Sequence, residues 1–368
     1  MSDGPTTFTA DNLTVYFQSQ RAAIEADLTT KLVAFIKGTQ HKLDCAIYDL
    51  RDPDVIAALQ SVAHDPNRSL RIAFDAGKDR TGGPIADPKP SGILQAIEDA
   101  GLGHVAKAAH NGSHLMHNKF LVRDGAVVWT GSANFTVGGL QLQDNNCLII
   151  NATDIANRYT DAFEKLLQDD HHTHQLHQSP TSGYAVNATT TIAPLFSPAS
   201  GEGIENAIVS VLSKAQKVRV LAFLNSDPGI LEDLVQLQNS DIAGVYDPNG
   251  MKDAMRGTHQ DPALFWFTQD PHFVAAPSHA FNPKREQDFM HNKVMIVDNR
   301  YVITSSYNFS ENAELNDENI LVIDSPDVAT AYTDYFDALF KHYSQQMHSS
   351  LRPNSNNHDT KGNTAIYC

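Results

Sequence analysis

Histidine, lysine, asparagine and aspartate residues recur at the same spacing in the two halves of the sequence. Two segments follow the pattern His-x-Lys-x4-Asp. The copies comprise His117, Lys119 and Asp124 in the first half, and His291, Lys293 and Asp298 in the second. Each copy is followed by a turn of small residues that carries an asparagine, Asn134 in the first half and Asn308 in the second. Two matches in step indicate a shared chemical task rather than chance.

These side chains are what the cleavage of a phosphodiester requires. The lysines and asparagines can donate hydrogen bonds to the non-bridging oxygens and neutralise charge as a pentavalent transition state forms. One histidine can attack phosphorus to give a phosphohistidine, while a second, protonated histidine gives its proton to the leaving oxygen. Two copies that meet face to face would supply this in-line pair. No metal ion is required for this chemistry, so we expect neither a metal nor another cofactor.

Short apolar runs predict the strands that position the histidines. Residues 119–122 and 293–297 are apolar and partly β-branched, as buried strands are. Because alternate side chains of a strand share a face, His117 and Lys119 should point the same way, and the second copy should do the same.

Other features return at nearly the same distance along the chain. The two motif histidines are 291 − 117 = 174 residues apart. A strand-like run at 43–48 leads to a helix-like run that Asp52 can cap, and a run at 218–223 leads likewise to Asp227. These matches indicate that the chain contains the same structural unit twice.

The predicted fold class is α/β, as a tandem duplication of one unit that covers about residues 12–165 and 192–345. Each unit should contain strand, helix, strand and helix, followed by a strand–turn–strand portion that holds the motif. This pattern predicts a mixed β-sheet flanked by helices. The predicted organisation is a first unit at 1–167, a polar linker at 168–191, a second unit at 192–345 and a polar tail at 346–368.

Three kinds of segment are expected to lie outside the two packed units. The linker contains four histidines, but it has neither a nearby cysteine nor spaced carboxylates, so we interpret it as solvated rather than metal-binding. Insertions at 78–90 and 247–260 are rich in glycine, proline and aspartate and are expected to be mobile loops. The tail is too polar to fold by itself.

Composition narrows the class of protein. The 368 residues are 41% hydrophobic, and no apolar run approaches the roughly 20 residues that cross a bilayer. The first residues lack the basic and apolar regions of a signal peptide, and the three cysteines show no paired spacing. We therefore expect a soluble protein in a reducing compartment, by default the cytoplasm.

The net charge bears on the partner. Lys and Arg total 27 against 43 Asp and Glu, which gives a formal charge of −16. This balance excludes a uniformly basic coat for nucleic acid. A locally basic cleft remains compatible with it, because the side chains that line a site set the field at a bound phosphate.

The doubled motif resembles the paired motifs of the phospholipase D superfamily, which includes phospholipases, phosphatidyltransferases, cardiolipin synthases and metal-independent nucleases. The resemblance spans both units and therefore most of the chain. It implies that the units pack as a pseudo-dimer with both motifs at a shared seam. A single chain would then make one complete active site and act as a monomer.

The resemblance also implies that a carboxylate or an amide shortly after each asparagine turn orients a histidine. The second copy has Glu318 at this place and the first has Asn145. We expect Glu318 to pair with His291 and Asn145 to pair with His117. A carboxylate raises the pKa of an imidazole and an amide does not. The hypothesis is therefore that His291 is the general acid and His117 the nucleophile.

Further motif residues are expected to support the site. Asp124 and Asp298 each end a strand beside a turn, so a structural role is favoured over a chemical one. Ser132 and Ser306 are expected to bond backbone or phosphate, since neither lies in a Gly-x-Ser-x-Gly elbow. Gly131 precedes Ser132 in the first turn, and Ser305 stands at the matching position of the second turn. Because glycine permits a closer approach of the backbone, we expect the second turn to be slightly wider.

The sequence leaves the substrate open between nucleic acid and phospholipid. The phrasing Met-His-Asn-Lys with Thr-Gly-Ser-x-Asn-Phe-Thr favours a nuclease-like phosphodiesterase. The alternatives are a phospholipase D or phosphatidyltransferase, and a non-catalytic phosphate-binding module. The aromatic run at 262–267 could line an acyl-chain entrance or stack bases, but we expect it to form a buried strand.

Overall fold

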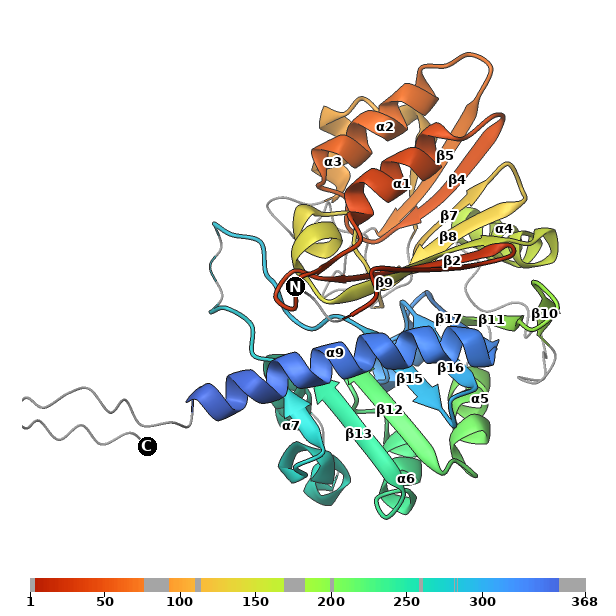
Figure 1. The fold of residues 1–368 in the computed structure, drawn as a ribbon. Coiled ribbons are helices and arrows are strands. Elements are labelled where there is room, and N and C mark those ends of the chain that lie inside the picture. Colours follow the sequence, from red (N-terminus) through yellow and green to blue (C-terminus); the bar gives the residue numbers. More distant parts are fainter. Residues whose placement is uncertain are drawn as a thin grey trace, which may run out of the picture.

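The computed structural model describes residues 4–75, 93–109, 114–168, 183–198, 202–257, 261–280, 282 and 284–350. Within these ranges the chain forms two α/β units, each built on one mixed β-sheet and flanked by helices (Figure 1). The fold class and the duplication predicted from the sequence are confirmed.

The strands of the two units correspond in order. The first unit contains β1 (Thr7–Ala10), β2 (Leu13–Ser19), β3 (Ile24–Glu25), β4 (Lys42–Ile47), β5 (Ser69–Asp75), β6 (Ala106–Ala109), β7 (Lys119–Arg123), β8 (Val127–Gly131) and β9 (Asn145–Asn151). The second contains β10 (Tyr184–Ala185), β11 (Thr191–Ser197), β12 (Lys217–Ala222), β13 (Asp241–Tyr246), β14 (Phe273–Ala275), β15 (Lys293–Val297), β16 (Tyr301–Ser305) and β17 (Glu318–Asp324). The sheet orders are β1-β2-β9-β8-β7-β4-β5-β6, with β3 beside β2, and β10-β11-β17-β16-β15-β12-β13-β14.

The motif strands β7 and β15 lie in the interior of their sheets. β7 pairs antiparallel with β4 and β8, and β15 pairs antiparallel with β12 and β16. Beyond β4 and β12 the strands run parallel, and the crossovers contain helices, as parallel pairing requires. Every residue of β15 is buried, which explains the continuous apolar run in the sequence.

Helices cover the sheets on both faces. The first unit contains α1 (Leu28–Lys37), α2 (Pro53–Ala63), α3 (Ile93–Asp99), η1 (Gly103–Val105), the π-helical η2 (Gly138–Leu142) and α4 (Thr153–Gln168). The second contains α5 (Glu202–Leu212), α6 (Pro228–Gln236), α7 (Pro248–Gly257), η3 (Pro262–Gln269), α8 (Glu311–Leu315) and α9 (Pro326–Ser350). Asp52 and Asp227 cap α2 and α6, as the sequence predicts. No helix within the described ranges has the length and apolar character needed to cross a membrane.

The two units share one hydrophobic core. Helix α4 packs on the first sheet and also contacts β11, while α9 packs on the second sheet and lies alongside the first unit (Figure 1). One continuous buried cluster joins Phe17 and Phe120 of the first unit to Val294 and Tyr335 of the second. The rings of Phe17 and Tyr335 stack with their centroids 4.7 Å apart. The units therefore pack as an intramolecular pseudo-dimer.

Three expectations about local structure are wrong. The segment at 247–260, expected to be a loop, contains α7. The aromatic run at 262–267 forms η3 rather than a strand, because Asp261 caps its first turn and a proline opens it. The side chains of Phe265 and Phe267 are nevertheless buried, as expected of that run. Helix α9 continues to Ser350, beyond the predicted start of the tail at 346.

Some predicted segments lie outside the described residues. These are the insertion at 78–90, the four linker histidines, and the tail from 351 onward. The last part of the predicted linker is described, and there Tyr184–Ala185 form β10 against β11. Cys45 and Cys147 are buried free thiols in the first sheet, as small core residues would be.

Candidate active site

Backbone hydrogen bonds across the seam position both motif histidines. The His117 N–H donates to the Asp317 carbonyl of the second unit at 2.8 Å. The His291 N–H donates to the Asp144 carbonyl of the first unit at 3.0 Å. Each histidine is therefore held by the segment that precedes the last strand of the opposite sheet. The two motifs meet at the seam, as the sequence resemblance implies.

This exchange between the units reverses the predicted histidine partners. The His117 Nδ1 lies 2.8 Å from a carboxylate oxygen of Glu318, and the His291 Nδ1 lies 3.0 Å from the Asn145 Oδ1. The sequence prediction paired each histidine with the orienting group of its own unit, and it is wrong. The physical reason is that each orienting residue directly follows the residue whose carbonyl accepts a hydrogen bond from the histidine of the other unit. It therefore lies against that histidine rather than against the one in its own unit.

The amide of Asn145 fixes the tautomer of His291. The Asn145 Nδ2 donates to the Gly139 carbonyl at 2.8 Å, so its Oδ1 faces the other way. That oxygen accepts from the Ser132 hydroxyl at 2.6 Å and from the His291 Nδ1. Because the partner is an acceptor, the proton sits on Nδ1, and Nε2 of His291 is left for chemistry.

The carboxyl of Glu318 holds the matching position in the second unit. It is fully buried, and burial raises the pKa of Glu318 to about 8, while Lys119 acts in the opposite direction. The hydroxyl of Ser306 bonds this carboxyl, as that of Ser132 bonds Asn145. Both serines thus orient the groups that hold the histidines, which agrees with a supporting role.

The site concentrates positive groups away from water. Burial lowers the pKa of His291 well below its usual value, and the charges of Lys293, Lys119 and His117 lower it further. Burial also lowers the pKa of Lys293 well below its usual value, and the charge of Lys119 contributes. Such crowding is unfavourable in an empty site and favourable around a bound anion. This is the locally basic cleft that the acidic net charge leaves possible.

Both motif lysines are fixed by their own motif. The Lys119 Nζ donates to the His117 carbonyl at 2.5 Å, and the Lys293 Nζ donates to the His291 carbonyl at 2.6 Å. Each ammonium also lies over an aromatic ring, 4.9 Å from the Tyr48 centroid for Lys119 and 5.3 Å from that of Phe223 for Lys293. These contacts hold each cation beside its histidine.

Within the described residues, the asparagines of the two turns each have an amide oxygen without a hydrogen-bond donor. Asn134 and Asn308 follow β8 and β16 and are partly exposed. In the described part of the chain, the buried Oδ1 atom of each has no hydrogen-bond partner. Donation to the non-bridging oxygens would come from the Nδ2 group of each amide, and this role of Asn134 and Asn308 stays a prediction.

Asparagines that the sequence prediction missed join the two units. The Asn146 Nδ2 donates to the Asn292 Oδ1 at 2.9 Å, and the Asn319 Nδ2 donates to the Asn118 Oδ1 at 2.8 Å. The amide of Asn319 also accepts from three buried hydroxyls, which belong to Thr130, Tyr159 and Ser305. The signal was present in the sequence, since an asparagine follows each motif histidine and each orienting residue.

The two small-residue turns share one unusual backbone dihedral angle. Gly131 has φ 153°, and Ser305 at the matching position has φ 145°. The greater width of the second turn stays a prediction. A Cβ at Gly131 would lie 2.3 Å from the Asn146 carbonyl oxygen. Ser305 has a side chain in this unfavourable region, and its hydroxyl bonds both Thr130 and Asn319 at the seam.

The motif aspartates have structural roles, as predicted. The Asp124 carboxylate accepts from the backbone N–H groups of Gln40, His41 and Lys42. Asp298 accepts in the same way from Gln216 and Lys217. Both aspartates therefore lie at the ends of the motif strands remote from the histidines, where they tie the turn to the start of the neighbouring strand.

A cavity of about 630 Å³ opens beside the second histidine. Its wall includes Phe223 and Phe289, whose ring centroids each lie 5.3 Å from that of His291. Lys252 and Arg256 line it together with Asp247 and Asp253, so its wall carries both signs of charge. A cavity with aromatic rings and charged side chains of both signs thus lies next to the second histidine.

Two duplicated α/β units with one composite histidine–lysine site define the class of this protein. Residues 32–167 and 190–340 match the family model described as "Cardiolipin synthase, PLD-like domain". The chain belongs to this phospholipase D-like family.

Known proteins resemble the chain in sequence or in fold. The mitochondrial cardiolipin hydrolase of Xenopus laevis is 31% identical over 140 residues, which are 38% of this chain and 61% of that protein. The phosphatidylserine synthase of Haemophilus influenzae Rd KW20 has a TM-score of 0.62 at 12% identity, covering 92% of this chain and 90% of the other. The polyphosphate kinase of Porphyromonas gingivalis has a TM-score of 0.53 at 12% identity, covering 85% and 45%. At these identities the two structures show a common fold.

The seam amides should contribute strongly to stability. We expect Asn319→Ala to lower the free energy of unfolding by about 2–3 kcal/mol, because it leaves buried hydroxyls and the Asn118 amide without partners. Urea unfolding would measure this change, with the exposed Asn239→Ala as the control, expected within about 0.5 kcal/mol of wild type. Equal stability of the two variants would contradict the role of the amide network.

Proposed function

We propose that this chain hydrolyses phosphodiesters through a covalent phosphohistidine, with no metal ion taking part in the bond changes. The observation that carries this proposal is the convergence of two histidine–lysine pairs from different units on one buried site, each histidine held through Nδ1. Because Nδ1 of each ring faces its orienting group, Nε2 is the ring nitrogen that would act on the substrate. The family membership supports the same class of reaction.

The electrostatics favour a bound phosphate. A phosphodiester carries one negative charge, and its non-bridging oxygens can accept from Lys119, Lys293, Asn134 and Asn308. Binding would relieve the repulsion that lowers the pKa of Lys293 in the free protein. The lysines would then stabilise the additional charge on the equatorial oxygens in the transition state.

His117 is the better nucleophile because of its carboxylate partner. Attack by its Nε2 on phosphorus forms an N–P bond and leaves the ring positively charged. Burial favours the protonated form of Glu318, but a positive ring whose Nδ1 lies 2.8 Å away favours the carboxylate, which then accepts from the Nδ1–H and stabilises that charge. The role predicted from the sequence is thus retained with a different physical reason.

His291 is the better proton donor because its surroundings make it a stronger acid. Its partner is the neutral Asn145, and burial and neighbouring lysines lower its pKa. The negative charge of a bound phosphodiester offsets those lysines, so the imidazolium forms when substrate is present. Its Nε2–H then protonates the leaving oxygen as the P–O bond breaks.

The second step reverses these roles. Neutral His291 takes a proton from water, whose oxygen attacks phosphorus as the P–N bond to His117 breaks. The products are the free histidine and a phosphate monoester, and His291 regains its proton. An alcohol in place of water would give transfer instead of hydrolysis.

The phospholipid class is the leading substrate. A curated relative that is 31% identical is named a cardiolipin hydrolase, and the matching family model is described by a cardiolipin enzyme. The net charge of −16 disfavours extended contact with a nucleic-acid backbone. A nuclease-like activity is the second candidate, which the motif phrasing supports and for which the aromatic rings of the cavity wall could stack a base.

A panel of substrates would test the function. Purified protein with EDTA would be incubated with cardiolipin and phosphatidylcholine vesicles, single- and double-stranded DNA, and RNA, with His117→Ala as the control. We expect turnover of phospholipid that the variant lacks. Cleavage of nucleic acid alone would overturn the lipid assignment, and absence of turnover on every substrate would favour a phosphate-binding module.

A substrate with a good leaving group should distinguish the roles of the two histidines. We expect either His→Ala variant to lose at least about 1000-fold in turnover of natural substrates. With a p-nitrophenyl phosphodiester, whose leaving group needs no proton, His291→Ala should release one equivalent of p-nitrophenol and accumulate phosphoenzyme. Peptide mapping should place the phosphate on His117, and its recovery on His291 in the wild-type protein would reverse the assignment.

Substitutions of the two orienting groups, Glu318 and Asn145, should have different kinetic effects. Glu318→Gln removes the charge that stabilises the phosphohistidine, so we expect kcat to fall about 100-fold with little change in KM. Asn145→Asp places a carboxylate against the Nδ1 of His291, the general acid, and raises the pKa of that imidazole. Since that acid must be protonated, the alkaline limb of the kcat profile should move to higher pH. An unmoved limb would show that His291 is not the acid.

A further inference from the structure

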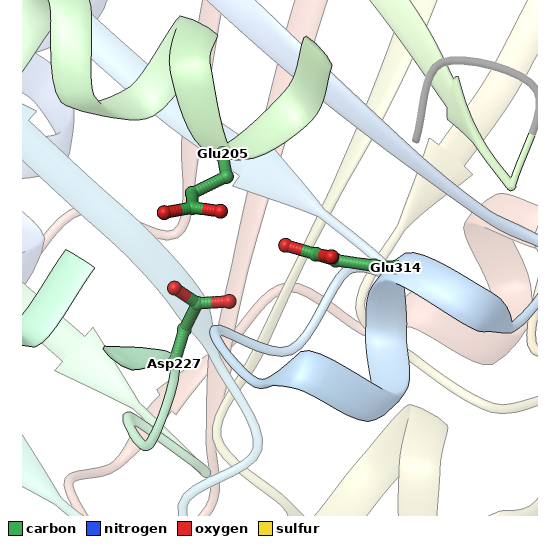
Figure 2. A group of neighbouring side chains, drawn as sticks. All are labelled: Glu205, Asp227 and Glu314. Carbon is green, nitrogen blue, oxygen red and sulfur yellow. The ribbon is translucent and has the colours of Figure 1, made fainter. Parts of the chain in front are cut away.

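Three carboxylates converge behind the turn that carries Asn308. Glu205 comes from α5, Asp227 caps α6, and Glu314 comes from α8; their side chains point toward one another (Figure 2). One carboxylate oxygen from each lies within 4.8 Å of the other two. The Asp227 N–H also donates to the Phe309 carbonyl at 2.9 Å, so the cluster is attached to the active-site turn.

At the corresponding location of the first unit, the capping aspartate is hydrogen-bonded to a neutral side chain instead of lying beside further carboxylates. There Asp52 caps α2, and Thr29 of α1 donates from its hydroxyl to the Asp52 carboxylate at 3.3 Å. Gln141 in turn donates to the Thr29 hydroxyl at 3.2 Å. Gln141 stands four residues before Asn145, as Glu314 stands four residues before Glu318. The second unit thus has two carboxylates where the first has a hydroxyl and an amide.

The replacement removes the hydroxyl and amide donors that serve this location in the first unit. Ionised carboxylates only accept hydrogen bonds, so the three groups cannot satisfy one another. One oxygen of Asp227 accepts from the Ile230 N–H, while the Oδ2 atom is buried and has no partner. Within the described ranges, no basic side chain forms an ion pair with Glu205 or Asp227.

A buried tyrosine provides an independent sign of a missing ligand. Tyr307 is fully buried, and its hydroxyl has no hydrogen-bond partner in the described part of the chain. Burial raises the pKa of Tyr307, and the charges of Asp227, Glu314, Glu318 and Glu205 raise it further, so the tyrosine lies near the cluster. The corresponding residue of the first unit, 307 − 174 = 133, is an alanine. An unpaired buried hydroxyl is unfavourable unless a bound ion or its water completes its contacts.

We propose that Glu205, Asp227 and Glu314 bind one hard divalent cation, Ca²⁺ or Mg²⁺, that braces the turn carrying Asn308. Carboxylate oxygens are the ligands that both ions prefer, with waters completing the coordination. Glu205 and Glu314 are only partly buried, which leaves the ion a path from solvent. The cation joins α5, α6 and α8 and takes no part in the bond changes at the histidines.

Cation binding would be measured on the full chain after treatment with chelator and its removal. CaCl₂ and MgCl₂ titrations by calorimetry would distinguish the two ions, and thermal unfolding would report stabilisation. We expect saturable one-to-one binding of at least one ion, with a rise in Tm of about 2 °C or more. Terbium would serve as a luminescent probe excited through tyrosine, and Tyr307→Phe should weaken the emission at unchanged stoichiometry.

The first unit supplies the matched control. The double variant Glu205→Thr/Glu314→Gln recreates the Thr29–Asp52–Gln141 arrangement and should bind the cation at least ten-fold more weakly. Its Tm without cation should equal or exceed that of the chelated wild type, because the repulsion is gone. Glu314→Gln alone would serve if the double variant fails to fold. Wild-type protein without saturable binding, or a variant that binds equally well, would overturn the proposal.

Discussion

The hydrogen bonds from each motif histidine to the carbonyl of the opposite unit are the constraint on which the site depends. They place the residue after that carbonyl, Glu318 or Asn145, against the imidazole of the other unit. Each half-site therefore consists of a histidine from one unit and an orienting group from the other. Neither unit contains a complete pair, and the shared core that holds α4 and α9 between the sheets is a requirement for chemistry as well as for stability.

The same packing creates the electrostatic character of the site. A protein with a formal charge of −16 gathers two lysines and two histidines at a buried seam, where solvent screens them poorly. Glu318 offsets part of the unfavourable crowding, and the core and the amide network hold the groups in place. A bound phosphate would remove most of it. Binding and catalysis thus use interactions that the folded protein holds ready before the substrate arrives.

Much of this architecture could be predicted from the sequence. The 174-residue offset predicts the duplication, the apolar runs predict β7 and β15, and Asp52 and Asp227 predict two helix starts. The partners of the histidines could not be predicted, because spacing along a chain reports neighbours within a unit and not contacts across a seam. The run at 262–267 was misassigned for a related reason, since burial of aromatic rings does not distinguish η3 from a strand.

Fusion of the two units in one chain allows their copies to differ. Two identical subunits would have identical half-sites. Here the corresponding positions of the two units differ: Glu318 corresponds to Asn145, Phe223 to Tyr48 and Ser305 to Gly131. An in-line reaction needs one histidine to gain a positive charge at phosphorus and the other to lose a proton, so these differences are useful rather than neutral. The second unit also has the strained Ser305 and the three carboxylates behind its asparagine turn. A cation there would stabilise the second half of the site, in which Ser305 has an unfavourable φ and three carboxylates lie close together.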